Sequence, residues 1–307
     1  LKTVQLFNTT LIINMKKLLR LIIIGAIIIL GYLILFPFTF QYNFKINHPP
    51  LALHLFLNTE NKFDIDQQGA VSFVQKMDTI SNGLIEWQVT PIDSLKSSVS
   101  SRLIYKRYDF ISKLLFWAPS NLDFEVFKTL NIQIKEKMRN KNDKISYGVI
   151  KNDSLNINQC LCKSFTSKIT EKANVMNKNI DLIATYIPKE YKSAPFLRVK
   201  EIDFKKNLLE FDFCFSVPKQ MIIEESNGYF ITDYKESYTK SIDFNGNYND
   251  SHFGWAFLMN SFKEKTIPTP FVETYKDNPF MGGDDKNWTS KVYFNNDSAK
   301  TIDLNHK

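Results

Sequence analysis

One order of strands and helices occurs twice between residues 145 and 296, and this repeat restricts the fold of the 307-residue chain most. The first copy comprises a strand near 147–151 or 158–165, a helix, and strands at 195–200 and 208–217. The second comprises a strand at 229–244, a helix, and strands at 270–276 and 288–294. Two βαββ units in tandem predict a pseudo-two-fold domain over 145–296, with a groove where its halves meet.

Hydrophobic periodicity supports these assignments. From Leu209 to Val217 apolar and polar residues alternate strictly, as in a half-buried antiparallel strand. The two helices carry apolar residues at three- and four-residue steps: Ile169, Ala173, Met176, Ile180, Ile183 and Ile187 in the first, and Trp255, Leu258, Met259 and Phe262 in the second. Ala194–Leu197 also matches Thr269–Val272 at the same place in each copy.

An earlier segment, 45–140, is predicted to hold strands followed by one long helix. The strands are expected at 69–76, 83–90 and 97–105, and the helix at 120–139. A charged stretch, 135–144, is the candidate domain boundary. The fold class expected for the whole chain is α+β.

The N-terminal region contains a 24-residue run without charge, Leu21–Phe44. About 20 helical residues span a bilayer core, so we expect a transmembrane anchor over 18–40 rather than the alternative, a cleavable signal peptide. Lys16, Lys17 and Arg20 precede the run, which predicts a cytoplasmic N-terminus over 1–17 and a periplasmic body at the bacterial inner membrane. Residues 1–14 are a possible upstream extension of the native chain, and 297–307 form a tail.

The net charge of +7 suggests nucleic-acid binding until its distribution is considered. Residues 1–20 contribute +4, residues 21–143 contribute +2, and residues 144–307 contribute +1. A nearly neutral body is a poor phosphate-binding surface, so we expect no nucleic-acid partner. Only four histidines and three cysteines are present, and no metal site or cofactor is expected.

The three cysteines lie in probable strands. Cys160 and Cys162 share one face of the first, and Cys214 lies in another. A disulfide is possible outside the cytoplasm, but we expect buried thiols.

A set of residues near the C-terminus resembles a known family. These are Gly246-Asn247-Tyr248, a helix with Trp255, the run Pro270-Phe271-Val272-Glu273-Thr274-Tyr275, Asn278-Pro279, and a last aromatic strand at 291–294. They are similar to the GyrI-like effector-binding domain of bacterial multidrug-responsive and AraC-type regulators. The resemblance implies a duplicated βαββ fold with a cleft for an organic, often cationic and aromatic, ligand.

Segment 45–140 resembles, more weakly, the START-like (SRPBCC) lipid-binding fold. The resemblance rests on Val89-Thr90-Pro91-Ile92 and the long helix 120–139. The usual aromatic-rich opening after the first strand is absent from this sequence. No helix-turn-helix segment is evident, so the transcriptional role of the effector-binding family does not carry over.

Glu273 is the main candidate for ligand binding. On a strand, Phe271, Glu273 and Tyr275 project to one face, where a carboxylate between aromatics can hold an organic cation. The resemblance also implies that Glu273 contacts the ligand and that Tyr248 and Trp255 form the pocket wall. The alternatives are a solvent-facing Glu273 and a Trp255 that only packs in the core. Arg198, the counterpart of Glu273 in the first copy, is expected to face the same groove or solvent.

The leading hypothesis for function is a membrane-anchored, sensor-like protein that binds a small organic ligand. No residue is assigned a catalytic role, because no sequence pattern of a known catalytic site is present. Two alternatives stay open: a hydrolase of a small activated substrate that uses Glu273, and an interaction protein of the cell envelope with an unknown protein partner.

Overall fold

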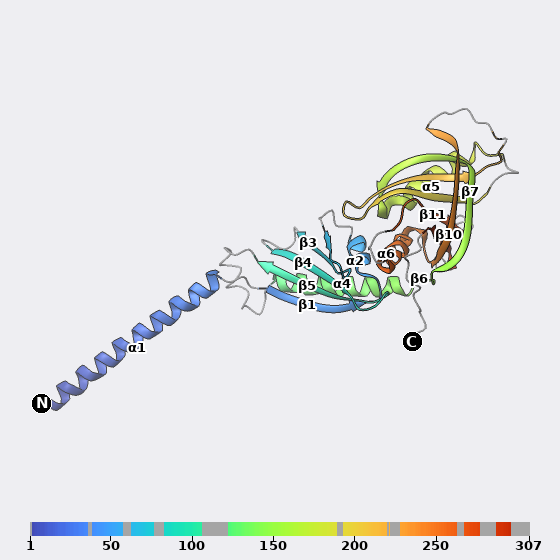
Figure 1. The fold of residues 1–307 in the computed structure, drawn as a ribbon. Helices are drawn as coiled ribbons and strands as arrows, with labels where there is room; N and C mark the ends of the chain where they lie inside the picture. Colours follow the sequence, from blue (N-terminus) through green and yellow to red (C-terminus); the bar gives the residue numbers. More distant parts are fainter. Residues whose placement is uncertain are drawn as a thin grey trace. The chain divides into compact units, whose positions relative to one another are not determined.

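A computed structural model describes residues 2–35, 39–57, 63–76, 83–105, 122–188, 193–219, 221, 228–262, 267–276 and 287–295. Within these ranges the chain is α+β, as predicted, with two antiparallel sheets and five α-helices (Figure 1). It divides into two compact units, 1–42 with 76–86 and 101–131, and 43–75 with 87–100 and 132–307. Both units contain parts of segment 45–140, whose START-like fold stays a prediction.

The first sheet has the strand order β1-β5-β4-β3-β2. Its strands are β1 (Thr39–Ile46), β2 (Phe63–Ile65), β3 (Val71–Lys76), β4 (Gly83–Pro91) and β5 (Ser97–Tyr105). The strands predicted at 69–76, 83–90 and 97–105 are thus confirmed as β3, β4 and β5. The predicted helix 120–139 corresponds to α4 (Leu122–Asn142). Strand β1 and helix α2 (Pro50–Leu57) were not predicted.

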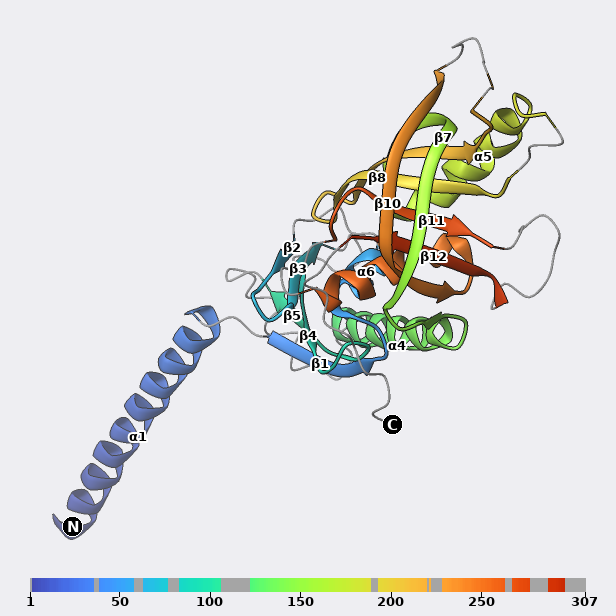
Figure 2. The same ribbon diagram turned by 45° about the vertical axis from the view of Figure 1, so that its right-hand side comes forward.

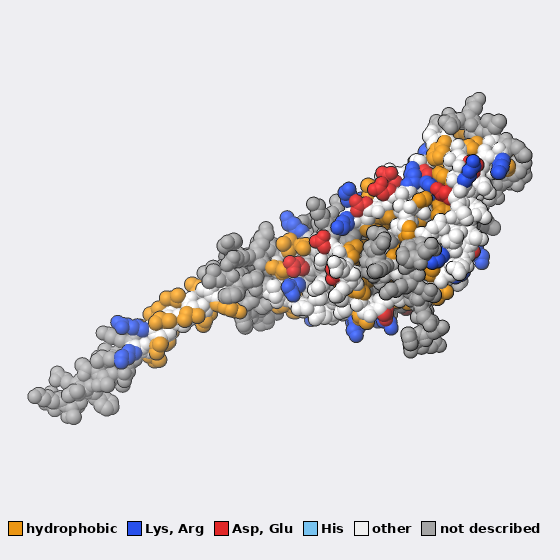
Figure 3. Space-filling model, in the orientation of Figure 1, with side chains coloured by type: hydrophobic (Ala, Val, Ile, Leu, Met, Phe, Trp, Pro, Cys, Tyr) orange, Lys and Arg blue, Asp and Glu red, His pale blue; other side chains and the backbone are white. Residues whose placement is uncertain are grey.

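Helix α1 extends from Lys2 to Leu35. The exposed basic residues Lys17 and Arg20 precede a stretch of exposed apolar side chains, seen in orange in Figure 3. Among the residues that the structure describes, no helix meets the length and hydropathy needed to cross a membrane. The transmembrane anchor expected over 18–40 is therefore not supported.

The second sheet contains both copies of the repeat. The first copy is β7 (Lys151–Lys168), α5 (Lys172–Ala184), β8 (Pro195–Asp203) and β9 (Leu208–Ser216). The second is β10 (Tyr229–Asn245), α6 (His252–Ser261), β11 (Phe271–Tyr275) and β12 (Thr289–Phe294). A short strand, β6 (Ser146–Tyr147), pairs with the end of β10. The predicted duplication of a βαββ order is confirmed.

Strand β10 closes this sheet into a ring. Residues 229–241 of β10 pair with β7, and residues 240–245 pair with β12. Since β12, β11, β8, β9 and β7 are also successive neighbours, six strands form a closed circuit (Figure 2). All six strands therefore have a partner on both sides, and the sheet presents two separate faces.

Helices α5 and α6 pack on one of these faces, against β7 and β10 respectively. Helix α6 has the sequence HFGWAFLMNS, and nearly all of its side chains are buried. A helix that is apolar on every side is expected to be buried in this way. Gly254 permits its close approach to β10, because a Cβ at this position would lie 3.2 Å from the Phe244 ring.

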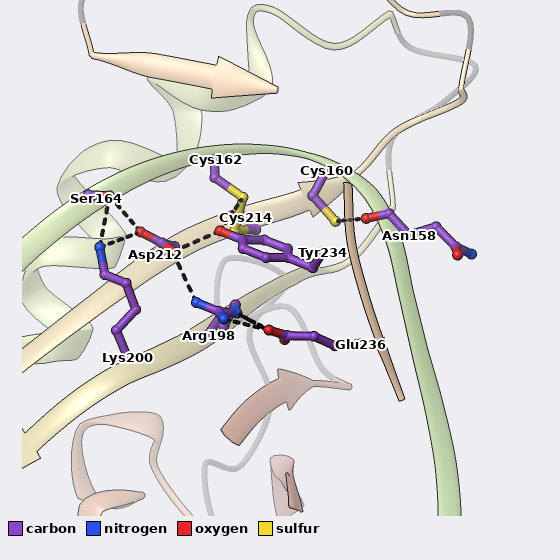
Figure 4. Close-up of a disulfide and its surroundings, with 10 residues drawn as sticks. All are labelled: Asn158, Cys160, Cys162, Ser164, Arg198, Lys200, Asp212, Cys214, Tyr234 and Glu236. Carbon is purple, nitrogen blue, oxygen red and sulfur yellow. Dashed lines mark hydrogen bonds and ion pairs between the residues drawn. A yellow bond between two sulfur atoms is a disulfide. The ribbon is translucent and has the colours of Figure 1, made fainter. Parts of the chain in front are cut away.

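The other face of the sheet carries a hydrogen-bonded network of charged side chains (Figure 4). Arg198 Nε donates to Glu236 Oε2 at 2.9 Å, and Tyr234 Oη donates to Asp212 Oδ2 at 2.7 Å. Although burial opposes ionisation, hydrogen bonds from Ser164 and Tyr234 lower the pKa of Asp212. The network lets a mostly buried sheet face hold charged groups, because each has a partner.

Next to this network, Cys162 and Cys214 form a disulfide with a Cα–Cα distance of 4.2 Å (Figure 4). The expectation of buried thiols is therefore wrong for these two residues. They are paired because β7 and β9 are antiparallel neighbours whose register places Cys162 directly opposite Cys214. Cys160 is a free, buried thiol, and burial raises its pKa to about 12, which keeps it in the unreactive neutral form.

We predict that reducing the disulfide lowers the free energy of unfolding by about 2–4 kcal/mol, because the bond closes a loop across 52 residues. Urea denaturation with and without dithiothreitol measures the change. The Cys160→Ala variant should show the same difference as the wild type. The double variant Cys162→Ala/Cys214→Ala should show none. Equal wild-type midpoints in both conditions would contradict the prediction.

Candidate functional site

A cavity of about 500 Å³ lies between helix α5, the ends of the neighbouring strands, and the segment that precedes α6. Its residues come from both copies of the repeat. From the first copy they are Ala173, Met176, Asn177, Ile180, Asp181, Ala184, Ser193, Ala194, Pro195, Phe213 and Phe215. From the second they are Asn247, Tyr248, Asn249, Tyr275, Lys276 and Trp288. The groove expected between the halves is thus found as a cavity large enough for a small organic molecule.

Three aromatic side chains of the second copy form one side of the cavity, and we call Tyr248, Tyr275 and Trp288 the aromatic wall. The ring centroids of Tyr248 and Tyr275 are 4.9 Å apart, and those of Tyr248 and Trp288 are 5.3 Å apart. Gly246 has φ of +143°, a conformation that favours glycine, and its N–H donates to the Trp288 carbonyl. This turn leads directly into η3 (Tyr248–Asp250) and so fixes Tyr248 beside Trp288.

The lining contributed by the first copy is also largely apolar. Met176 and Ile180 lie one helical turn apart on α5. Phe213 and Phe215 come from the same face of β9, because alternate residues of a strand share a face. The alternation detected in the sequence of β9 is therefore the pattern that supplies two rings to the cavity.

Polar groups at the cavity are mostly uncharged. Asn177, Asn247 and Asn249 offer amide groups, and Asn247 also accepts a hydrogen bond from the N–H of Asn249 at 2.9 Å. The lining includes one acidic residue, Asp181, and one basic residue, Lys276, both of which are exposed. The cavity thus combines apolar walls with neutral hydrogen-bonding groups, and its two ionised side chains balance in charge.

Behind the aromatic wall lies an ion pair that is wholly buried. Lys172 Nζ is 3.1 Å from Glu273 Oε2, and the two side chains are 1% and 0% exposed. The ammonium of Lys172 also donates to Ser251 Oγ. It lies 4.8 Å from the centroid of the Trp255 ring and 5.9 Å from that of Tyr275. A carboxylate and two aromatic faces therefore surround a cation that belongs to the protein itself.

Burial and charge act against each other at this pair. Burial lowers the pKa of Lys172, while the neighbouring Glu273 carboxylate raises it, and the net direction is downward. Burial and the Glu273 carboxylate raise the pKa of Tyr275 well above its usual value, so this phenol stays neutral. Glu273 Oε1 has no hydrogen-bond partner within the part of the chain that the structure describes. Lys172 is thus the ion partner of Glu273 there.

The candidate residues predicted from the sequence divide into two groups. Tyr248 and Tyr275 line the cavity. Phe271, Glu273 and Trp255 do not, and each is fully buried, with the Phe271 and Trp255 rings packed edge to face at 5.3 Å. The prediction that Phe271, Glu273 and Tyr275 share a strand face agrees with β11. Of these three residues, however, Phe271 and Glu273 point into the core.

Arg198 does not face the groove or lie free in solvent. The register of β8 and β11 places Arg198 opposite Val272, while Glu273 is opposite Leu197. Arg198 therefore belongs to the face that carries Glu236 and the disulfide. The expectation was wrong because matching the two copies by sequence does not determine which face each residue occupies.

Sequence reasoning missed Lys172 and Trp288. Lys172 precedes Met176 by four residues, so it lies on the apolar face of its helix, an unusual position for a lysine. A lysine on the apolar face of a helix indicates a buried acidic partner, so this position could have identified Lys172 from the sequence. Trp288 directly precedes β12 and was assigned only to a strand. Its place in the aromatic wall depends on the hydrogen bond from Gly246, which periodicity does not reveal.

The described residues include no group of three or more His, Cys, Asp or Glu side chains placed to hold a metal ion. Asn278-Pro279, part of the pattern that resembles the effector-binding family, lies outside the described ranges.

No protein-family model and no curated protein matches the sequence. The chain is similar in structure to the C-terminal domain of EcmrR, with a TM-score of 0.37 and 13% identity over 50% of this chain and 99% of that one. It is also similar to SAV2435 bound to tetraphenylphosphonium (TM-score 0.30, 10% identity, 51% and 98% covered). The chain is also similar to a hydrolase from Listeria innocua, with a TM-score of 0.29 and 8% identity over 47% of this chain and 90% of that one.

We predict that Lys172→Met and Glu273→Gln each lower the free energy of unfolding by about 3–5 kcal/mol. Each substitution removes one partner of the buried ion pair and leaves the other without a counter-ion. The double variant should lose less than the sum of the two. Urea denaturation of all four proteins measures this coupling.

The control for this cycle is Lys96→Met, because Lys96 pairs with Asp93 on the surface, where both side chains are about half exposed. This variant should change the free energy by no more than about 1 kcal/mol. Strictly additive losses at Lys172 and Glu273 would show that the buried pair is not coupled.

Proposed function

We propose that this protein binds a small aromatic organic molecule in the cavity between the two βαββ copies. The observation that carries the proposal is the cavity itself, which has a volume of about 500 Å³ and is lined by the aromatic wall together with Met176, Phe213 and Phe215. Sites of this size, lined by apolar side chains with a few polar groups, are typical of ligand-binding proteins.

The balance of groups in the cavity supports binding rather than a chemical step. Its interior is apolar and aromatic, and its ionised side chains, Asp181 and Lys276, are exposed. Glu273, which a hydrolytic role would require, is not among the lining residues and is paired with Lys172. A binding protein with a sensor-like role is therefore the function that this geometry favours.

We predict that the uncharged fluorescent probe N-phenyl-1-naphthylamine binds the wild-type protein and that Ala184→Trp weakens this binding by about tenfold or more, because the new ring fills the cavity. Ala184 lines the cavity near the end of α5. Fluorescence titration of the probe measures the dissociation constants.

Leu182→Trp provides the matched control for this experiment. Leu182 is on the same helix but is 55% exposed and does not line the cavity. The control should bind the probe as the wild type does. If Ala184→Trp also kept the wild-type affinity, the probe would be binding elsewhere and the proposed site would be wrong.

We further propose that the body of the protein lies outside the cytoplasm at the bacterial inner membrane. The Cys162–Cys214 bond supports this location, because disulfides persist in oxidising compartments and are rare in the cytosol. The exposed apolar residues of α1, such as Leu21 and Ile28, support contact with lipid, since water is a poor solvent for a continuous apolar surface.

We predict that Cys162 and Cys214 are oxidised in cells that express the full chain. Thiols would be blocked with a maleimide before lysis, and the disulfide would be detected by mass spectrometry. A chain that starts at Lys45 and is made in the cytosol should contain both thiols reduced. In cell fractionation, the full chain should also sediment with the membranes. Reduced cysteines and a full chain found in the soluble fraction would contradict the proposed location.

A further inference from the structure

The ion pair behind the aromatic wall has a consequence for the kind of ligand that the cavity accepts. Glu273 and the faces of Trp255 and Tyr275 surround one cation, the ammonium of Lys172. A carboxylate flanked by aromatic rings is a favourable setting for an organic cation. In this protein a side chain of the protein already occupies that setting.

From this arrangement we infer that Lys172 acts as a built-in cation and that the adjoining cavity selects uncharged aromatic molecules over organic cations of the same shape. This inference rests on the proposed binding function and adds the chemical class of the ligand. Tyr275 connects the two sites, because its ring lines the cavity and also lies 5.9 Å from Lys172 Nζ.

The electrostatic argument has two parts. Lys172 and Glu273 together carry no net charge, so the protein offers no excess negative charge behind Tyr275 to attract a cation. At the cavity itself, Asp181 and Lys276 also cancel in formal charge. An ammonium that leaves water for these apolar walls would lose hydration without gaining a counter-ion, whereas an uncharged aromatic would lose little.

The position of Lys172 supports its role as a fixed component. It is the first residue of α5, where the helix dipole disfavours a positive charge. It is nevertheless 1% exposed, is bound to Glu273, and donates to Ser251. Glu273 and Ser251 therefore hold the ammonium in place, and a ligand cation would have to displace it to reach Glu273.

Two probes of equal shape test the inference: 2-tert-butylnaphthalene, which is uncharged, and trimethyl(naphthalen-2-yl)ammonium, in which N⁺ replaces the quaternary carbon. Fluorescence titration of the full chain gives a dissociation constant for each. The wild type should bind the uncharged probe at least about tenfold more tightly than the ammonium. A wild type that binds the ammonium as tightly or more tightly would overturn the inference and leave the proposed function intact.

Substitutions at the ion pair give the second part of the test. Lys172→Met removes the built-in cation, so the ammonium should gain about tenfold relative to the uncharged probe. Glu273→Gln should shift the ratio in the opposite direction, and the double variant, which is again neutral, should have the wild-type ratio. Lys178→Met is the control, because Lys178 is an exposed lysine of α5 that does not line the cavity, and it should change the ratio by less than about threefold.

An unchanged ratio in folded Lys172→Met would overturn the inference, since Lys172 would then have no influence on the ligand. If Lys172→Met does not fold, the wild-type comparison and the double variant decide the question. If the wild type bound neither of the two probes, the proposed function would be overturned, and the inference with it.

Discussion

Pairing of β10 with two strands is the interaction on which the rest of the structure depends. By joining β7 with one part of its length and β12 with another, β10 turns a row of strands into a ring. The ring gives the sheet two faces with different environments. One carries Arg198, Asp212 and Glu236 in a hydrogen-bonded network, and the other carries the helices and the cavity.

The two faces use charge in different ways. On the face with the disulfide, each ionised group has several partners, and partial access to water lowers the cost of keeping them charged. On the helix face, a single pair, Lys172 and Glu273, is removed from water altogether. Such a pair contributes less to stability than its short distance suggests, but it is costly to break. Its main effect is on the local charge beside the cavity.

Local patterns in the sequence predicted most of the elements. The alternation from Leu209 to Val217 and the three- and four-residue steps of α5 and α6 depend only on neighbours along the chain, so they are readable without a structure. Helix α2 was missed because seven of its eight residues are apolar, so the segment shows no hydrophobic periodicity.

Features that depend on strand register could not be predicted. The bond between Cys162 and Cys214, and the separation of Arg198 from Glu273 by opposite faces, both follow from which residues lie opposite each other. Two of the five residues of the predicted site, Tyr248 and Tyr275, do line the cavity. The burial of Glu273 became clear only once Lys172, 101 residues away in sequence, was known to lie beside it.

The disulfide also makes the two copies of the repeat different, because only the first copy, which is synthesised first, is cross-linked. Both of its cysteines belong to the first copy, and Cys214 precedes the start of β10 at Tyr229. The cross-link between β7 and β9 therefore involves no residue of the second copy. Strand β10 pairs with β7, which the disulfide links covalently to β9. One half of this duplicated domain is thus equipped to serve as the template on which the other half is built.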